Sequence, residues 1–203
     1  MTVSIIALKG NYLKYLSTIF ESFDYLDTNE NVSFNNALDL NNYLWENYIE
    51  FSKKDLSLKG VWFCDDYTII CDPEMIDSTN EETLLQISNT LNTEVFSFII
   101  QTTSATFGYA KFHQNIQRIF YMSDGIIIKN EGTPLTEETS VNISEKIFID
   151  DILNLSKKFG IDLEGYNSNH FIAKSLTYND KLTQELKEFE TSTNKTKPWW
   201  KIW

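Results

Sequence analysis

The sequence predicts an α+β protein built on a mostly antiparallel sheet of about six or seven strands, with helices packed chiefly on one face. Two features lead to this fold class. Residues 94–130 concentrate aromatic and β-branched side chains in short runs separated by turn signals, as in consecutive antiparallel strands. On both sides of this stretch, apolar residues recur every three or four positions, the spacing of a helix with one buried face. We therefore place the meander of residues 94–130 at the centre of the sheet.

The turns of the meander set its expected register. Asp124-Gly125 is a dipeptide that type I′ hairpin turns prefer, because both residues accept a positive φ. A second turn at Gln114-Asn115 places Lys111 opposite Arg118 across the ladder. The same two turns pair Met122 with Ile127, Tyr121 with Ile128, His113 with Ile116, and Tyr109 with Phe120.

The remaining elements follow from shorter patterns. Strands are expected at residues 2–8, in a hairpin over residues 60–71 that turns at Asp65-Asp66, and at a sheet edge over residues 170–176. Helices are expected to begin near Asn11, after Ser33, after Thr79, and near Asn179 or Asp180. A further helix is expected to end at Gly160, with Phe148, Ile152, Leu155 and Phe159 on one apolar stripe. Residues 24–32 are polar and acidic, with a short strand only at residues 25–26. An alternative is that the N-terminal strand and first two helices form a small separate layer.

Length and composition predict one domain over residues 1–190 and a polar tail over residues 191–203. With 203 residues, 42% of them hydrophobic, the chain can bury one sizeable core. The tail ends in a segment that holds Trp199, Trp200 and Trp203. Two interpretations remain open for these rings: they dock on the domain itself, or they form an interaction peptide for a partner.

Three features predict a cytoplasmic protein that is not attached to a membrane. The N-terminus lacks the basic region of a signal peptide. No apolar stretch reaches the ~20 residues that span a membrane. In the expected hairpin Cys64 lies opposite Tyr67 and Cys71 opposite Gly60, so the two thiols cannot bridge and indicate a reducing compartment. The abundance of Asn, Lys and Ile points to a bacterial chain.

The charge is unevenly distributed along the chain. The formal net charge of -12 argues against nucleic acid as a partner, because binding it requires a basic surface. Residues 21–82 hold 15 acidic residues and three lysines, whereas residues 83–130 are close to neutral. We expect this acidic block to contact a basic protein partner. The candidate contact residues are Asp24, Asp27, Glu30, Asp39, Glu46, Glu50, Asp65 and Asp66.

No pattern of catalytic residues or metal ligands stands out, so no catalytic residue, metal or cofactor is assigned. The chain has only two histidines, His113 and His170, and no nucleophile elbow or glycine-rich phosphate loop. Asp72, Glu74 and Asp77 cluster after an expected strand. They fit either a site for a hard cation or ordinary turn and capping roles, and the sequence favours the second.

Arg118 is the only arginine in the chain, against 16 lysines. The expected register places it in mid-strand opposite Lys111, where two like charges repel unless an anion lies over them. That anion is either a carboxylate from the acidic block or a ligand, because arginine captures carboxylate or phosphate with two parallel hydrogen bonds. The candidate ligand-binding residues are Tyr109, Lys111, His113 and Arg118.

Two functions follow from these observations. The first is a non-catalytic, cytosolic binding protein whose acidic N-terminal block engages a basic partner. In size and charge the chain resembles the small acidic immunity proteins that bacteria make against their own toxins, a resemblance that no sequence motif carries. The alternative is a protein that binds a small anion, or an enzyme, with its site around Arg118.

Overall fold

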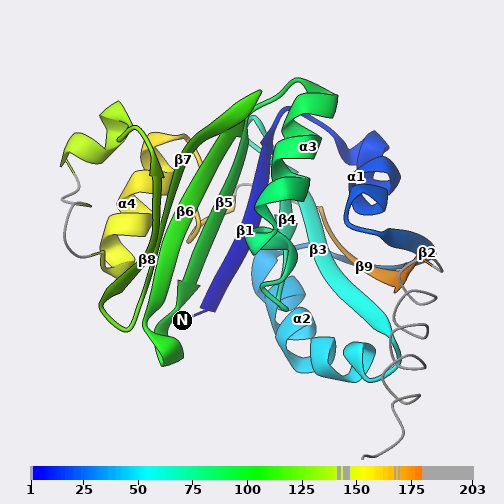
Figure 1. Cartoon of the computed structure of the whole chain (residues 1–203). Helices are drawn as coiled ribbons and strands as arrows, with labels where there is room; N and C mark the ends of the chain where they lie inside the picture. Colours follow the sequence, from blue (N-terminus) through cyan, green and yellow to red (C-terminus); the bar gives the residue numbers. More distant parts are fainter. Residues whose placement is uncertain (1, 141–142, 144–146, 167, 169, 180–203) are drawn as a thin grey trace, which may run out of the picture.

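The computed structural model describes residues 2–140, 143, 147–166, 168 and 170–179, which form four α-helices and one antiparallel sheet of nine strands. The predicted α+β class is confirmed, with more strands than expected (Figure 1). The strands are β1 (Thr2–Lys9), β2 (Tyr25–Phe34), β3 (Leu56–Cys64), β4 (Tyr67–Cys71), β5 (Val95–Gln101), β6 (Thr106–His113), β7 (Asn115–Ser123), β8 (Ile126–Gly132) and β9 (Phe171–Tyr178). The helices are α1 (Leu16–Ser22), α2 (Ala37–Ser52), α3 (Glu81–Leu91) and α4 (Ile149–Lys158).

The strand order is β2-β9-β3-β4-β1-β5-β6-β7-β8, which makes β1 the middle strand. The meander of β5 to β8 forms one half of the sheet, so β1 rather than the meander occupies its centre (Figure 1). This position also excludes the alternative of a separate N-terminal layer. β1 suits the centre because residues 4–8 are buried whichever face they point to.

Most of the expected register is confirmed. The pairs Lys111–Arg118, Tyr109–Phe120, Met122–Ile127, Cys64–Tyr67 and Gly60–Cys71 are present. Two expected pairs are wrong because a β-bulge shifts the register: Ile116 lies opposite Phe112 rather than His113, and Tyr121 opposite Lys129 rather than Ile128.

Two clusters of buried apolar side chains lie on opposite faces of the sheet, because Ile5 and Ala7 of β1 belong to one and Ile6 and Leu8 to the other. The larger cluster includes residues of α2 and α4, and the smaller includes residues of α1 and α3. Each face therefore carries two helices, while the greater part of the core lies on the side of α2 and α4.

The main surprise of the fold is β2, a ten-residue strand where a polar segment with only a short strand was expected. β2 forms the sheet edge, whereas β9, expected there, lies between β2 and β3. Most side chains of β2 are exposed, so the sequence shows no apolar alternation there. Ser33 consequently lies in β2, and Asn36 caps α2 instead, its Oδ1 accepting from the Asp39 amide at 2.9 Å.

The structure also bears on the expectations for the two cysteines, for membrane-spanning helices and for the C-terminal tail. Cys64 and Cys71 are free and buried. None of the helices among the described residues is long and apolar enough to cross a membrane. The expected final helix and the tryptophan-rich tail lie outside the described residues.

Gly108 provides a test of how tightly β6 packs on β7. A Cβ added there would lie 2.2 Å from Cδ1 of Tyr121 and 2.5 Å from the Phe120 carbonyl oxygen. Because backbone atoms must move, we expect Gly108→Ala to lower the free energy of unfolding by about 1–3 kcal/mol in urea titrations. Gly165→Ala is the control, since the nearest atom is the tip of the Asp162 side chain at 3.1 Å. Equal effects of the two variants would contradict the expectation.

Candidate functional site

Arg118, the centre of the predicted ligand site, is buried and holds a carboxylate from its own chain. Its Nε and Nη2 donate to the two carboxylate oxygens of Glu138 at 2.7 and 3.2 Å. Its Nη1 donates to Oδ1 of Asn130 at 2.6 Å and to the Glu131 carbonyl at 3.1 Å. The expected anion is therefore present, but it comes from the short 3-10 helix Thr136–Ser140 and not from the acidic block.

The structure brings only part of the predicted ligand site together. The Tyr109 hydroxyl also donates to Glu138, and its burial raises the pKa of Tyr109. Lys111 instead forms an ion pair with Glu94 at 2.9 Å and lies over the Phe96 ring. His113 is half-buried, and its Nδ1 has no hydrogen-bond partner among the described residues. An external anion at Arg118 thus stays a prediction, and it would have to replace Glu138.

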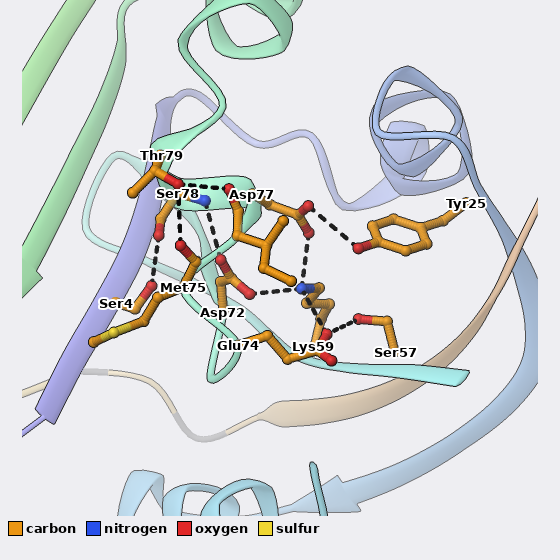
Figure 2. A network of polar contacts seen from close by, with 11 residues as sticks. Ser4, Tyr25, Ser57, Lys59, Asp72, Glu74, Met75, Asp77, Ser78 and Thr79 are labelled. Carbon is orange, nitrogen blue, oxygen red and sulfur yellow. Dashed lines mark hydrogen bonds and ion pairs between the residues drawn. The ribbon is translucent and has the colours of Figure 1, made fainter. Parts of the chain in front are cut away.

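Lys59, which sequence reasoning did not single out, forms a second buried centre of charge (Figure 2). It lies in mid-β3 with none of its side chain exposed. Its Nζ is 2.6 Å from Oδ1 of Asp72, 2.8 Å from Oδ2 of Asp77 and 3.5 Å from Oε2 of Glu74. These are the three acids that the sequence offered as a cation site or as turn residues. The ammonium group of Lys59 is the cation that they surround.

Local structure positions each of these carboxylates. Asp72 directly follows β4, and its Oδ2 accepts from the Ser78 amide at 3.0 Å. Asp77 begins the 3-10 helix Asp77–Thr79 and accepts from the Tyr25 hydroxyl at 3.3 Å. Ser57 lies two residues before Lys59 and therefore on the same face of β3. Its hydroxyl group donates to Oε2 of Glu74 at 2.5 Å. The centre therefore joins β2, β3 and the segment after β4.

The electrostatics of the Lys59 centre are unbalanced, since one ammonium group faces three carboxylates. Burial acts to lower the pKa of Lys59, but Asp72 and Asp77 outweigh it and hold that pKa well above its usual value. Burial raises the pKa of Asp77 to about 6, against the opposing effect of Lys59. The ammonium is enclosed by these partners, so the arrangement stabilises the fold and offers no free nucleophile or base. No group of three or more His, Cys, Asp or Glu in the described part of the chain is arranged to hold a metal.

The predicted partner-binding acids belong to β2, α2 and the β3–β4 turn or lie next to them, and β2, β3 and β4 lie on the same side of β1 in the sheet (Figure 1). All are exposed except Asp27, which is half-buried and pairs with Lys174. They form three groups: Asp24, Asp27 and Glu30 in or beside β2, Asp39, Glu46 and Glu50 on α2, and Asp65 and Asp66 in the β3–β4 turn. The acids therefore lie on elements of the same half of the sheet but in three separate groups.

Helix α2 combines charge with strongly exposed apolar groups. Ile49, 52% exposed, lies near Glu46 and Glu50, and Leu38, 68% exposed, lies near the start of the helix, one residue before Asp39. Three hollows of about 620, 300 and 370 Å³ each border the helix. Acidic and apolar side chains together on one accessible helix face are features of a protein-binding surface.

Comparisons of the chain with protein-family models, with curated proteins and with solved structures found no match.

Replacing Lys59 tests how much the buried ion pairs around its ammonium group contribute to the free energy of unfolding. In Lys59→Met, Asp72 and Asp77 stay buried without their counter-charge, and we expect the free energy of unfolding to fall by about 3–5 kcal/mol in urea titrations. Lys53→Met is the matched control, because this lysine is exposed and its ion pair with Glu50 is exposed as well. If Lys59→Met were as stable as Lys53→Met, the centre would not hold the fold together.

The raised pKa of Asp77 predicts a specific pH dependence. Between the ordinary aspartate pKa of about 3.9 and a pH of about 6, the folded protein binds a proton at Asp77 that the unfolded chain does not. The stability that this proton provides is complete at the acidic end of that interval and is lost as the pH rises through about 6.

Asp77→Asn, which cannot ionise, isolates this contribution from that of other acids. We expect the wild type to lose on the order of 2 kcal/mol relative to Asp77→Asn as the pH rises across this interval, measured by urea titration at each pH. A difference between the two proteins that stays constant with pH would contradict the assignment.

Proposed function

We propose that this protein is a non-catalytic binding protein whose acidic side, with α2 at its centre, engages a basic protein partner. The observation that carries the proposal is that α2 exposes Ile49 near Glu46 and Glu50, and Leu38 near the start of the helix. Acidic groups at the rim of an interface speed association and select basic partners. Apolar side chains beside them supply the area that binding buries.

The two buried charge centres favour binding over catalysis. Arg118 is occupied by Glu138, and Lys59 is surrounded by three carboxylates of its own chain. A catalytic group must reach its substrate, whereas these groups are turned to one another inside the fold. An immunity protein that neutralises a basic bacterial toxin would use the exposed acidic side in the same way, through charge-steered association.

The test is capture of partners from a lysate of the natural host with tagged protein, at low and at moderate salt. We expect one stoichiometric basic protein, held more weakly as salt rises because the attraction is screened. With the purified partner, Glu46→Lys combined with Glu50→Lys should weaken binding at least about tenfold by calorimetry.

The control is Glu131→Lys combined with Asp150→Lys, which makes the same change in net charge on exposed residues outside the acidic block. Circular dichroism checks that both double variants are folded. Two results would contradict the proposal: recovery of no stoichiometric partner, or equal weakening of binding by the two double variants.

A further inference from the structure

The largest of the three hollows around α2 lies between that helix, the first half of β1 and the segment that follows α4. Its volume is about 620 Å³, within the roughly 300–1,000 Å³ typical of ligand sites. Val3, Ile5 and Cys71 line it from the strands, whereas Trp45 comes from α2 and Tyr166 from the segment after α4. The hollow therefore has apolar strand residues beneath it and aromatic residues at its sides.

Neighbouring rings hold both aromatic residues in place. Trp45 packs edge-on against Tyr48, with ring centroids 5.6 Å apart. Tyr166 packs edge-on against Trp62 at 4.6 Å. Indole and phenol rings attract cations through the negative charge of their π faces, and the attraction grows where water is excluded. Two aromatic rings fixed around a hollow are thus suited to an organic cation.

The polar residues that line the hollow also favour a positively charged ligand. Asn41 and Glu164 are among its lining residues, which include no lysine or arginine in the part of the chain that the structure describes. Glu164 pairs with Lys157 at 2.7 Å, but Lys157 also lies 3.8 Å from Asp162. Two carboxylates thus face one ammonium group beside the hollow, so it retains negative charge. An anionic ligand would meet two carboxylates against one ammonium group there.

We propose that this hollow binds a guanidinium or ammonium group carried on an apolar stem. On the proposed function, this group is an arginine or lysine side chain of the basic partner, and the inference rests on that function for its source. The stem would contact Val3 and Ile5, the cation would lie against Trp45 and Tyr166, and Glu164 would balance its charge. A free small amine shares this chemistry and is the other source that the test must distinguish.

The experiment follows NMR signals of the full-length protein during titration with acetyl-glycyl-arginyl-glycine amide. We expect saturable shifts of the Trp45 indole N–H, which Trp45→Phe identifies by its loss, and of the Tyr166 backbone amide. The matched probe has citrulline in place of arginine, with the same shape and no charge, and should bind at least about tenfold more weakly. Equal binding of the two peptides, or the absence of saturable shifts at these residues, would overturn the proposal.

Two variants locate the binding within the hollow. Glu164→Gln removes an exposed carboxylate without changing the core, and we expect it to lower the affinity for the arginine peptide several-fold. Glu131→Gln, at an exposed acid on β8, is the control and should leave the affinity unchanged. Agmatine, a free guanidinium amine, distinguishes the sources: tighter binding of the peptide supports a protein partner, and tighter binding of agmatine overturns that source.

The outcome can be separated from that of the proposed function. If a captured basic partner is lost with the Glu46→Lys and Glu50→Lys variant but binds Glu164→Gln and Trp45→Leu like the wild type, the hollow is not its anchor site and this inference fails alone. If the hollow binds the arginine peptide while no basic partner is recovered, the proposed function fails and the cation site stands.

Discussion

The buried ion pairs of Lys59 with Asp72 and Asp77 join the segment after β4 to strand β3. Charges inside a protein are stable only when they satisfy one another, because each has lost its water. Lys59 meets this requirement by drawing Asp72 and Asp77 onto β3. The 3-10 helix that begins at Asp77 is thereby fixed, and Ser78 within it bonds to Ser4 of β1 and, through its carbonyl, to Ser97 of β5. Helix α3 starts from this anchored segment two residues later.

Local patterns predicted those elements of the fold whose side chains differ between a buried and an exposed face. The turn at Asp124-Gly125 is of this kind and is present. The apolar stripe of α4 is present at Ile152 and Leu155, whereas Phe148, expected on the same stripe, is 64% exposed. The strand β2 escaped prediction because an edge strand with mostly exposed side chains shows no alternation. The central position of β1 also could not be predicted from the sequence. Turns show only which consecutive strands pair, whereas β1 pairs with β4 and β5, which lie far from it in the sequence.

The candidate sites likewise include features that local sequence patterns predicted and features that they did not. Arg118 was conspicuous as the single arginine, and its need for an anion followed from facing Lys111. The identity of that anion, Glu138, depended on how the chain folds back after β8. Lys59 was missed because lysine is almost never fully buried, so a lone lysine in a strand was no signal of a charge centre. The hollow beside α2 combines four separate segments, which no local pattern connects.

Both outermost strands of the sheet carry a β-bulge, β2 between Asp27 and Asn31 and β8 opposite Tyr121 and Met122. The outer backbone groups of an edge strand are a template for a strand from another molecule, and a bulge turns them out of line. The irregularity has its greatest effect at β8, where Ile126 and Ile128 are each 65% exposed. On a regular edge strand these apolar side chains would favour association with a strand of another molecule. The irregular edges thus hinder the pairing of a further strand with the nine-stranded sheet.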